Sequence, residues 1–442
     1  MVASASGSDE MRHSAPPTGV LGLGKRMSRA GLPTLVVLGI SVILPVLGRG
    51  YLNDQDFAMW AILATVGSVG VTFDMGGPQM TAALMPGTDH GGRLFWQSSL
   101  LSAIGAMLVG FVGALLWLPY SSTAAAGDWT LAAGMLAIAF MALGSAARSV
   151  TSVAAAAYLV VDRHRARASV LVGQAVAQLF VLVACLEADF GVWSLPLSLV
   201  LSSAGAAVWS AVALRTTFHA THGDDPERSG RDLESLRGSI RRFASARTVA
   251  LALSVVLTQG DRWVIGALGG ATTLANYELA WRFAVAPKLL AIALVSTITP
   301  DTARILAAKK AQHLRAMNRH ATIIVAAAVT AGSLAVVCVA LIVVPLLVTT
   351  PSADTISVML VPLLVAHGLH SVTAPGTHLA AGVGRPEVEL GYLAVGAGVT
   401  AVGWTAAFAT SSVEAAIAAV VSGLVLGSLW FLSRQPHLRD VP

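Results

Sequence analysis

The chain has 442 residues, of which 55% are hydrophobic and only 12% are charged, and its mean hydropathy is +0.73. This composition excludes a soluble globular domain and is typical of a polytopic membrane protein. The formal charge is +5, but the basic residues lie in short segments between apolar runs, so they report topology and not a nucleic-acid-binding face. Cys185 and Cys338 both lie within apolar runs, which predicts core positions and gives no support for a disulfide framework or a cysteine-based metal site.

Residues 1–30 are rich in Ser, Gly and Pro and are predicted to form a disordered cytoplasmic tail rather than a cleaved signal peptide. A helix needs about 20 apolar residues to cross the hydrocarbon core of a membrane. On that basis the sequence predicts an all-α membrane protein with about twelve spans. The predicted spans are residues 32–50, 57–77, 94–118, 129–161, 168–186, 190–214, 248–268, 275–299, 321–348, 355–383, 388–409 and 413–432.

A single long polar segment, residues 215–247, divides these spans into two equal groups. We therefore expect two six-helix halves, residues 31–214 and 248–433, joined by a basic linker and followed by a short tail at 434–442. Transporters built from two repeats have this organisation. A faint internal echo, Trp60 in the second span and Tyr277 in the eighth, agrees with a duplication, although aromatic residues favour membrane interfaces in any case.

The basic residues also predict the orientation. All but five of the 28 lysine and arginine residues fall on one side of the predicted membrane, which the positive-inside rule assigns to the cytoplasm. The loops on the opposite side are short and carry acids such as Asp54, Asp128 and Glu187. We therefore expect both termini to be cytoplasmic. The five exceptions are Arg49, in an outer loop, and Arg148, Arg262, Arg282 and Lys288, within spans.

Residues 258–300 concentrate charge inside the predicted membrane. Two adjacent spans there carry Asp261, Arg262, Glu278, Arg282 and Lys288. An ionised side chain near the bilayer centre costs about 2.5–3.5 kcal/mol on insertion scales, so these groups need either partners or water. The sequence therefore predicts a wet cavity lined by protein.

Short motifs occur at corresponding places in the two halves. The first half has Tyr51 to Trp60 followed by Phe73-Asp-Met-Gly76, and the second has Asp261-Arg262-x-x-Ile265-Gly266, Tyr277-x-x-Ala280-x-Arg282, Pro287 and Pro300. In this order the chain resembles the polysaccharide repeat-unit flippases of the multidrug/oligosaccharidyl-lipid/polysaccharide exporter superfamily, over nearly its whole length. It departs from the family at Ala58 and Ala275, where a glycine is usual.

This resemblance implies a transporter that moves a polyprenyl-diphosphate-linked oligosaccharide from the cytoplasmic to the outer leaflet by alternating access. The residues fit that cargo, because fixed cations in a water-filled cleft would offset the desolvation of a diphosphate. Candidate partners are a polysaccharide polymerase or glycosyltransferases, together with membrane lipids. Two alternatives remain open: a drug or metabolite antiporter, and a membrane scaffold that transports nothing and binds an assembly complex through its basic linker.

Each candidate residue has a structural alternative. Arg148, about 21 Å from the cytoplasmic arginine cluster that follows its span, is expected to line the cavity. The alternatives are an ion pair with another helix and a shorter span that leaves Arg148 at the interface. Glu278 and Arg282 have the (i, i+4) spacing of a local pair, and Asp261 with Arg262 could form another. The predicted cargo-binding residues are Arg148, Arg282, Lys288, Arg262 and Arg49, of which Arg49 could equally be an interface anchor.

The sequence has no ATP-binding motif, so an ion gradient or the membrane potential is the expected energy source. The candidate coupling acids are Asp74, Asp261 and Glu278, although Asp74 beside Gly76-Gly77-Pro78 could simply cap a bend. His367 and His370 share a helix face, and His378 follows a Pro-Gly break, a pattern that favours polar or proton-sensitive contacts over a metal site. No catalytic constellation is found, so we expect neither an enzyme nor a cofactor.

Overall fold

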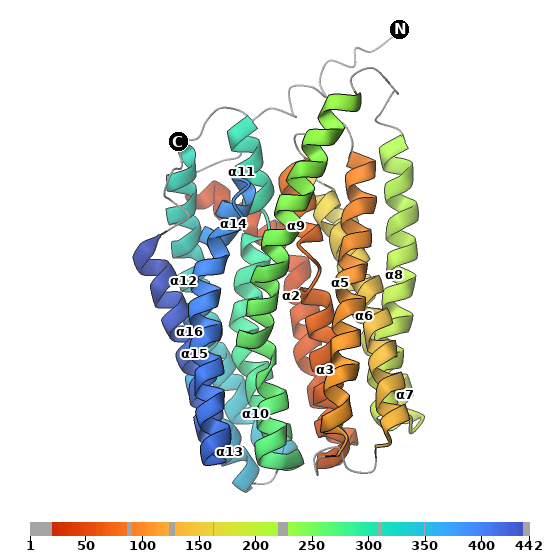
Figure 1. Ribbon diagram of the computed structural model, residues 1–442, viewed down its shortest axis with the longest axis vertical. Helices are drawn as coiled ribbons and strands as arrows, with labels where there is room; N and C mark the ends of the chain where they lie inside the picture. Colours follow the sequence, from red (N-terminus) through yellow and green to blue (C-terminus); the bar gives the residue numbers. More distant parts are fainter. Residues whose placement is uncertain are drawn as a thin grey trace.

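The computed structural model describes residues 20–85, 91–122, 129–161, 163–219, 229–307, 312–348 and 350–435, and these form a single bundle of long, roughly parallel helices (Figure 1). Eleven segments of the described chain are long and apolar enough to cross a membrane. One of them, Arg237–Leu306, is 70 residues long and reverses direction at Gly270, so it crosses twice. The prediction of an all-α protein with twelve spans in two six-helix halves is therefore confirmed.

The first half contains six crossings, and its helices pack mainly on one another. Its elements are α2 (Val20–Tyr51), α3 (Asp54–Thr72), α4 (Gly77–Leu84), α5 (Gly91–Tyr120), α6 (Leu131–Val160), α7 (His164–Glu187), the short η3 (Gly191–Trp193) and α8 (Ser194–His219). The fourth span is one continuous helix from Leu131 to Val160.

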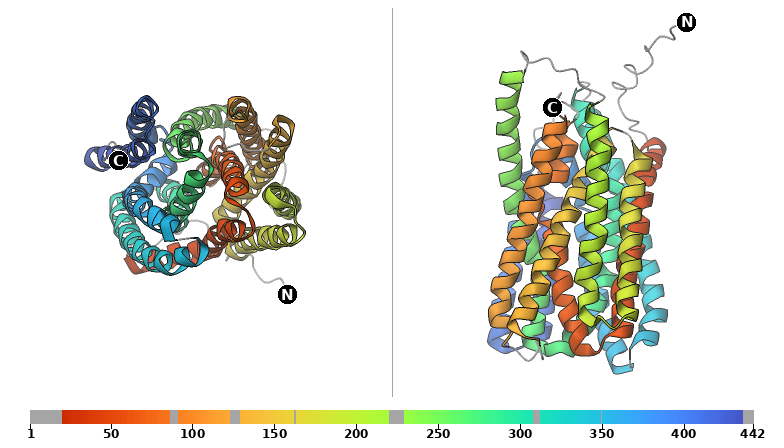
Figure 2. Two further views of the ribbon diagram at one scale, coloured as in Figure 1. Left: turned by 90° about the horizontal axis from the view of Figure 1, so that it is seen from below. Right: turned by 90° about the vertical axis from the view of Figure 1, so that its right-hand side faces the viewer.

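The second half contains the other six crossings. Its elements are α9 (Ser229–Gln259), α10 (Asp261–Val295), α11 (Ile298–Ala307), α12 (His313–Leu347), α13 (Thr350–Ser371), α14 (Ala374–Gly382), α15 (Val388–Thr410) and α16 (Val413–Arg434). The view from below shows most helices of each half grouped together, while part of α2 lies beside the second half, where it contacts α10 and α12 (Figure 2). We call the end of the bundle where α9 begins and α16 ends the terminal end, and the end with the turn at Gly270 the far end.

The predicted polar linker is largely helical. Helix α8 continues to His219 and α9 already begins at Ser229, while residues 220–228 lie outside the described chain, as do most of the two predicted tails. The seventh span is thus a helix that extends well beyond the apolar stretch from which it was predicted. The basic residues 237–247 consequently sit on a rigid surface.

Three spans bend near the terminal end, and the predicted boundaries of the second and eighth spans stop short for this reason. The chain turns between α3 and α4, between α10 and α11, and between α13 and α14. A proline lies in the first turn of each following helix, Pro78, Pro300 and Pro375, where its missing N–H costs no helical hydrogen bond. Helices α4, α11 and α14 contact one another, and we call this group the terminal plug.

The two halves touch at both ends of the bundle. At the terminal end, Arg304 of α11 donates a hydrogen bond of 2.6 Å to the carbonyl of Val160, at the end of α6. At the far end, Thr272 Oγ1 donates to Asp54 Oδ2 at 2.9 Å, and the rings of Tyr120 and Trp263 meet edge to face at 5.1 Å. This conformation is therefore held together on both sides of the membrane.

The prediction that both cysteines are core residues is wrong for Cys338, which is exposed on α12, while Cys185 is half-buried. The neighbouring side chains Leu334, Leu341 and Ile342 on α12 are exposed as well. Lipid is as apolar as a protein core, so an apolar run in the sequence cannot distinguish the two surroundings.

The turn between the seventh and eighth spans requires a glycine. Gly270 has φ 72° and ψ −172°, a conformation that only glycine adopts readily, although a Cβ there would meet no atom within 4 Å. We expect Gly270→Ala to lower stability by roughly 1–3 kcal/mol through backbone strain alone. The matched control is Gly205→Ala in α8, where a Cβ also meets nothing and the residue is helical, so that alanine should stabilise slightly. Thermal unfolding in detergent measures both variants. Equal unfolding midpoints for Gly270→Ala and Gly205→Ala would show that the backbone at Gly270 is not strained by alanine.

Candidate functional site

The densest cluster of charge within the membrane lies on both arms of α10. Because α10 reverses at Gly270, the arm that carries Asp261 and Arg262 comes beside the arm that carries Glu278. Arg262 is only 1% exposed. Its Nε donates to Glu278 Oε2 at 2.9 Å, and one terminal nitrogen donates to Asp261 Oδ1 at 3.0 Å.

Two aromatic residues and a second arginine complete this cluster. The guanidinium carbon of Arg262 lies 3.6 Å from the ring centroid of Trp281, a cation–π contact. The hydroxyl of Tyr277 donates to Asp261 Oδ2 at 2.5 Å, and Arg282 Nε donates to Glu278 Oε1 at 2.5 Å. We call Asp261, Arg262, Glu278 and Arg282 the ionic network.

The ionic network contains two acids and two bases, so its formal charge is zero. Arg262, Asp261 and Glu278, which the sequence offers as cargo-binding or coupling residues, are buried together here and face one another instead of an open cavity. Arg282 is partly exposed but is committed to Glu278. This geometry corresponds to the structural pairs that the sequence allows as the alternative, because breaking a buried pair leaves an uncompensated charge.

Lys288 lies beyond the ionic network, directly after Pro287 in α10. It is half-buried and forms no salt bridge with a described residue. Lys288 lies within electrostatic range of His367 and His370 of α13, in the interior of the second half. His367 is fully buried with its ring edge on Trp281, and neither ring nitrogen has a hydrogen-bond partner among the described residues.

His370 and His378 have other surroundings. The Nδ1 of His370 lies 3.4 Å from Ser428 Oγ, and its ring packs on Tyr392. His378, in the terminal plug, lies 3.2 Å through Nδ1 from Thr299 Oγ1. The break in the helix thus separates His378 from the other two histidines, as the sequence predicts.

Arg148 is the in-membrane cation of the first half. It is half-buried on α6, and its guanidinium donates to Gln178 Oε1 of α7 at 3.2 Å. One turn earlier on α7, buried Gln174 donates to Ser203 Oγ at 2.9 Å. Among the described residues Arg148 has no acidic partner, so the ion pair that the sequence allows as an alternative to a cavity-lining role is not formed here.

Asp74 and Arg49 both form contacts within the protein that stabilise its structure. Asp74 lies in the bend between α3 and α4, where Oδ1 accepts a hydrogen bond of 2.8 Å from the amide of Gly76, the capping role that the sequence gives as its alternative. Arg49 pairs with Asp54 at the far end, beside the ring of Phe57. Because Asp54 also accepts from Thr272, Arg49 supports the contact between the halves.

Sequence reasoning missed four residues, namely Gln178, Trp281 and the pair formed by Arg247 and Glu389. Gln178 could have been suspected, since a glutamine within an apolar span needs a polar partner. Trp281 gave no signal, because tryptophan is common in membrane helices. The buried pair of Arg247 on α9 with Glu389 on α15 joins residues that the sequence places in a linker and at the start of a span.

No protein-family model and no curated protein sequence matches the chain. By structure it is similar to a mutant of the Vibrio cholerae MATE transporter VcmN, with a TM-score of 0.74 and 14% identity over 96% of this chain and 99% of that one. It is also similar to a MOP superfamily transporter from Pyrococcus furiosus, with a TM-score of 0.69 and 15% identity over 98% and 99% of the two chains.

A third similar structure is the outward-facing conformation of a multidrug resistance MATE family transporter of the MOP superfamily. Its TM-score is 0.65, and its identity is 15% over 99% of this chain and 100% of that chain. The matches cover 96% or more of this chain and therefore extend over both halves. The chain therefore has the fold of MATE and MOP superfamily transporters.

Proposed function

We propose that this protein is a transporter that moves a polyprenyl-diphosphate-linked oligosaccharide across the membrane. The observation that carries the proposal is the presence of two cations in the interior of spans, Arg148 and Lys288, that have no acidic partner among the described residues. The acids and bases of the ionic network pair with one another, so none of its acids is available to Arg148 or Lys288. An anionic cargo would supply their missing counter-charge.

The two cations belong to opposite halves and lie at similar depths. At 1.5 Å per residue, Arg148 is about 26 Å along α6 from Leu131, and Lys288 is about 27 Å along α10 from the turn at Gly270. A diphosphate must leave water to cross the bilayer, and charge-assisted hydrogen bonds from fixed cations offset that desolvation. A cation from each half allows the headgroup to remain bound while the halves move.

The transport cycle follows from the contacts between the halves. Release of Arg304 from the Val160 carbonyl would open the terminal end, and release of Thr272 from Asp54 would open the far end. Opening one end while the other stays closed is alternating access. In this proposal the terminal end faces the cytoplasm of a bacterium, at its inner membrane, and a polysaccharide polymerase or glycosyltransferases act on either side of the transport step.

The driving force is proposed to be the membrane potential or an ion gradient. Among the candidate coupling acids Asp74, Asp261 and Glu278, Asp74 alone forms no salt bridge with a described residue and lies at a bend of the plug. That position allows a bound cation to change the geometry of the bend. Asp261 and Glu278 would first have to leave the ionic network.

A second candidate is export of a drug or metabolite, because the structural neighbours include a multidrug resistance transporter. The Pyrococcus furiosus neighbour, by contrast, is described as having a binding pocket of reverse polarity that suggests a different function. The unpaired cations of this chain favour an anion over an organic cation. A scaffold that transports nothing would have no use for unpaired cations within its spans, so these cations also favour a transporter over a scaffold.

Reconstitution into proteoliposomes tests the proposal. A fluorescent polyprenyl-diphosphate oligosaccharide is placed in one leaflet, and its loss from that leaflet is followed with and without an imposed potential. The control cargo is the same glycan on an uncharged polyprenol. We expect protein-dependent movement of the diphosphate and little movement of the uncharged cargo. Movement of a cationic dye alone would instead support the antiporter, and no movement under any gradient would contradict transport of this lipid.

A further inference from the structure

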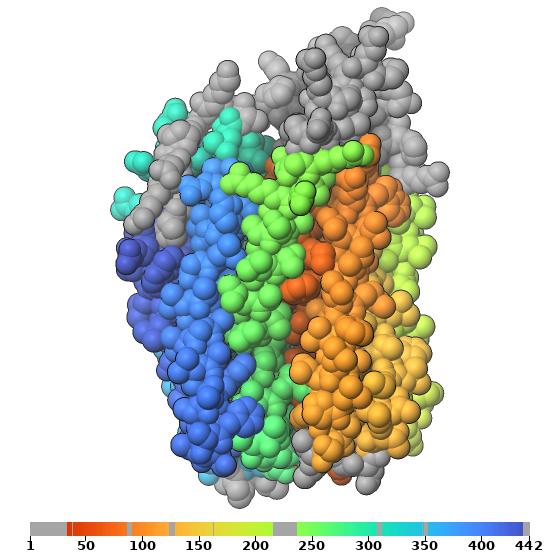
Figure 3. Space-filling model, viewed as in Figure 1, coloured from red at the N-terminus to blue at the C-terminus, as the bar shows by residue number. Residues whose placement is uncertain are grey.

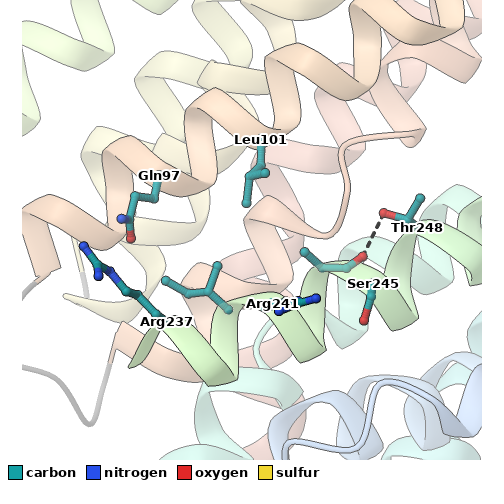
Figure 4. A pocket seen from close by; sticks show the side chains of 8 residues that line it. Gln97, Leu101, Arg237, Arg241, Ser245 and Thr248 are labelled. Atoms are coloured by element: carbon teal, nitrogen blue, oxygen red, sulfur yellow. Dashed lines mark hydrogen bonds between the residues drawn. The ribbon is translucent and has the colours of Figure 1, made fainter. Parts of the chain in front are cut away.

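A groove of about 410 Å³ opens on the surface between α5 of the first half and α9 of the second, near the terminal end. The space-filling view shows the seam between these two helices (Figure 3). In the close-up, Gln97 of α5 and Arg237 of α9 reach toward each other, and Arg241 follows one turn along (Figure 4). Deeper in, the walls are formed by Leu101, Ile240 and Ala244, together with Ser245 and Thr248, whose hydroxyls donate to backbone carbonyls of their own helix.

The arginines of α9 divide between two faces. Arg242 pairs with Glu387 at 2.9 Å, and Arg247 pairs with buried Glu389, so both have an acidic partner on the side of α15. Arg237 and Arg241 are exposed, line the groove and form no salt bridge with a described residue. Their (i, i+4) spacing places both guanidinium groups on the same face of α9. The mouth of the groove is therefore cationic.

Helix α4 closes the inner side of the groove. A Cβ on Gly76 would lie 2.7 Å from the side chain of Arg247 on α9, and one on Gly77 would lie 2.0 Å from Ser102 Oγ on α5. These close approaches seat the start of α4 against both walls. A ligand in the groove would thus come from the surrounding membrane and would not enter the interior in this conformation.

The groove has the dimensions of one leaflet. Gln97 lies one turn inside the predicted span 94–118, and Arg237 reaches toward it, so the mouth of the groove lies near the end of the hydrocarbon. From Arg237 to Thr248, the last lining residue, α9 rises about 16 Å at 1.5 Å per residue. Half of a hydrocarbon core of about 30 Å is about 15 Å. A cationic mouth above an apolar strip of this length matches a phosphate headgroup with an acyl chain.

We propose that this groove binds one anionic phospholipid of the leaflet at the terminal end. Arg237 and Arg241 hold its phosphate, Gln97 donates a further hydrogen bond, and an acyl chain lies along Leu101, Ile240 and Ala244. Basic pockets between membrane helices on the cytoplasmic side are recognised sites for such headgroups. The lipid would touch both halves at their seam and so favour the conformation in which α5 and α9 are close. The site does not depend on the identity of the cargo.

Native mass spectrometry of the purified full chain tests the site, with phosphatidylglycerol and phosphatidylcholine of identical acyl chains as probes. We expect phosphatidylglycerol to remain bound to the unaltered protein. The double variant Arg237→Gln with Arg241→Gln should bind it roughly ten-fold or more weakly, because each basic residue near the surface contributes about 1 kcal/mol. The control is Arg315→Gln with Arg319→Gln, an exposed pair of the same spacing on α12, which should change nothing.

Two further experiments test the binding of the acyl chain separately from the binding of the headgroup. Ala244→Leu fills the apolar strip and should weaken phosphatidylglycerol while both arginines remain. Glycerophosphoglycerol, the headgroup without chains, should compete poorly. Equal retention of the two lipids, or an equal loss from the α12 control, would overturn the site. Full competition by the free headgroup would show an anion site without an acyl chain and would overturn the lipid assignment.

Discussion

Replacing Lys288 by glutamine is expected to abolish most transport while the protein still folds and inserts. Glutamine keeps a polar side chain of similar reach but removes the charge, and a hydrogen bond to a charged group contributes about 1.5–3 kcal/mol, which corresponds to a roughly 10- to 100-fold slower translocation if the contact tightens during crossing. Arg148→Gln should have an effect of similar size, since it removes the corresponding cation of the first half. Initial rates of leaflet exchange in proteoliposomes measure both variants.

Charge-conserving and distant variants make this result specific. Lys288→Arg should recover a substantial part of the rate, because the cation remains. Arg315→Gln, an exposed cation outside the membrane interior, should leave the rate unchanged. If Lys288→Gln and Arg148→Gln both transport the diphosphate cargo at the unaltered rate, neither cation binds it, and the cationic site proposed for this protein is wrong. A scaffold would tolerate both variants in a cell-based assay.

Arg262→Met is expected to have the largest effect on stability. The residue is 1% exposed and contacts Glu278, Asp261 and the ring of Trp281. Methionine fills part of the space but leaves two buried acids facing one base, and removing one partner of a buried pair typically costs about 3–5 kcal/mol. Thermal unfolding of the detergent-solubilised protein measures the loss, with Arg315→Met as the exposed control.

A second substitution that restores the neutrality of the ionic network separates the contribution of charge to this loss of stability from the contribution of packing. Arg262→Met combined with Glu278→Gln leaves Asp261 and Arg282 as one acid and one base. We expect the double variant to be more stable than the sum of the two single losses, with a coupling of about 1–3 kcal/mol. Strictly additive losses would mean that packing around Trp281, and not charge, makes Arg262 important.

Much of the fold could be predicted because a membrane imposes a simple rule on each span. Length and apolarity alone located twelve crossings, and Gly269-Gly270 marked the turn between the seventh and eighth. The bends were harder to delimit. Pro78 and Pro300 signal a break, but the continuation of the second span into α4 and of the eighth into α11 depends on packing within the terminal plug, which single residues do not encode.

The sequence predicted which residues belong to the site, but it did not predict how they are arranged in space. The sequence identified Arg262, Glu278 and Arg282 as charges that require a reason, and it offered local pairing as one of two reasons. It could not show that the reversal at Gly270 brings Asp261 and Arg262 against Glu278, because that contact joins two helical arms in space. Nor could it find Gln178 as the partner of Arg148, which depends on how α6 rotates against α7.

The terminal plug also determines how the protein can change shape. Its three short helices each follow a bend in a different span, and each contacts the other two. None of the bends can straighten by itself without breaking contacts with two neighbours. Movement at this end should therefore be cooperative, with one energy barrier shared by three hinges. A substitution that stiffens a single hinge would then slow the entire cycle while leaving the equilibrium affinity for the cargo largely unaltered.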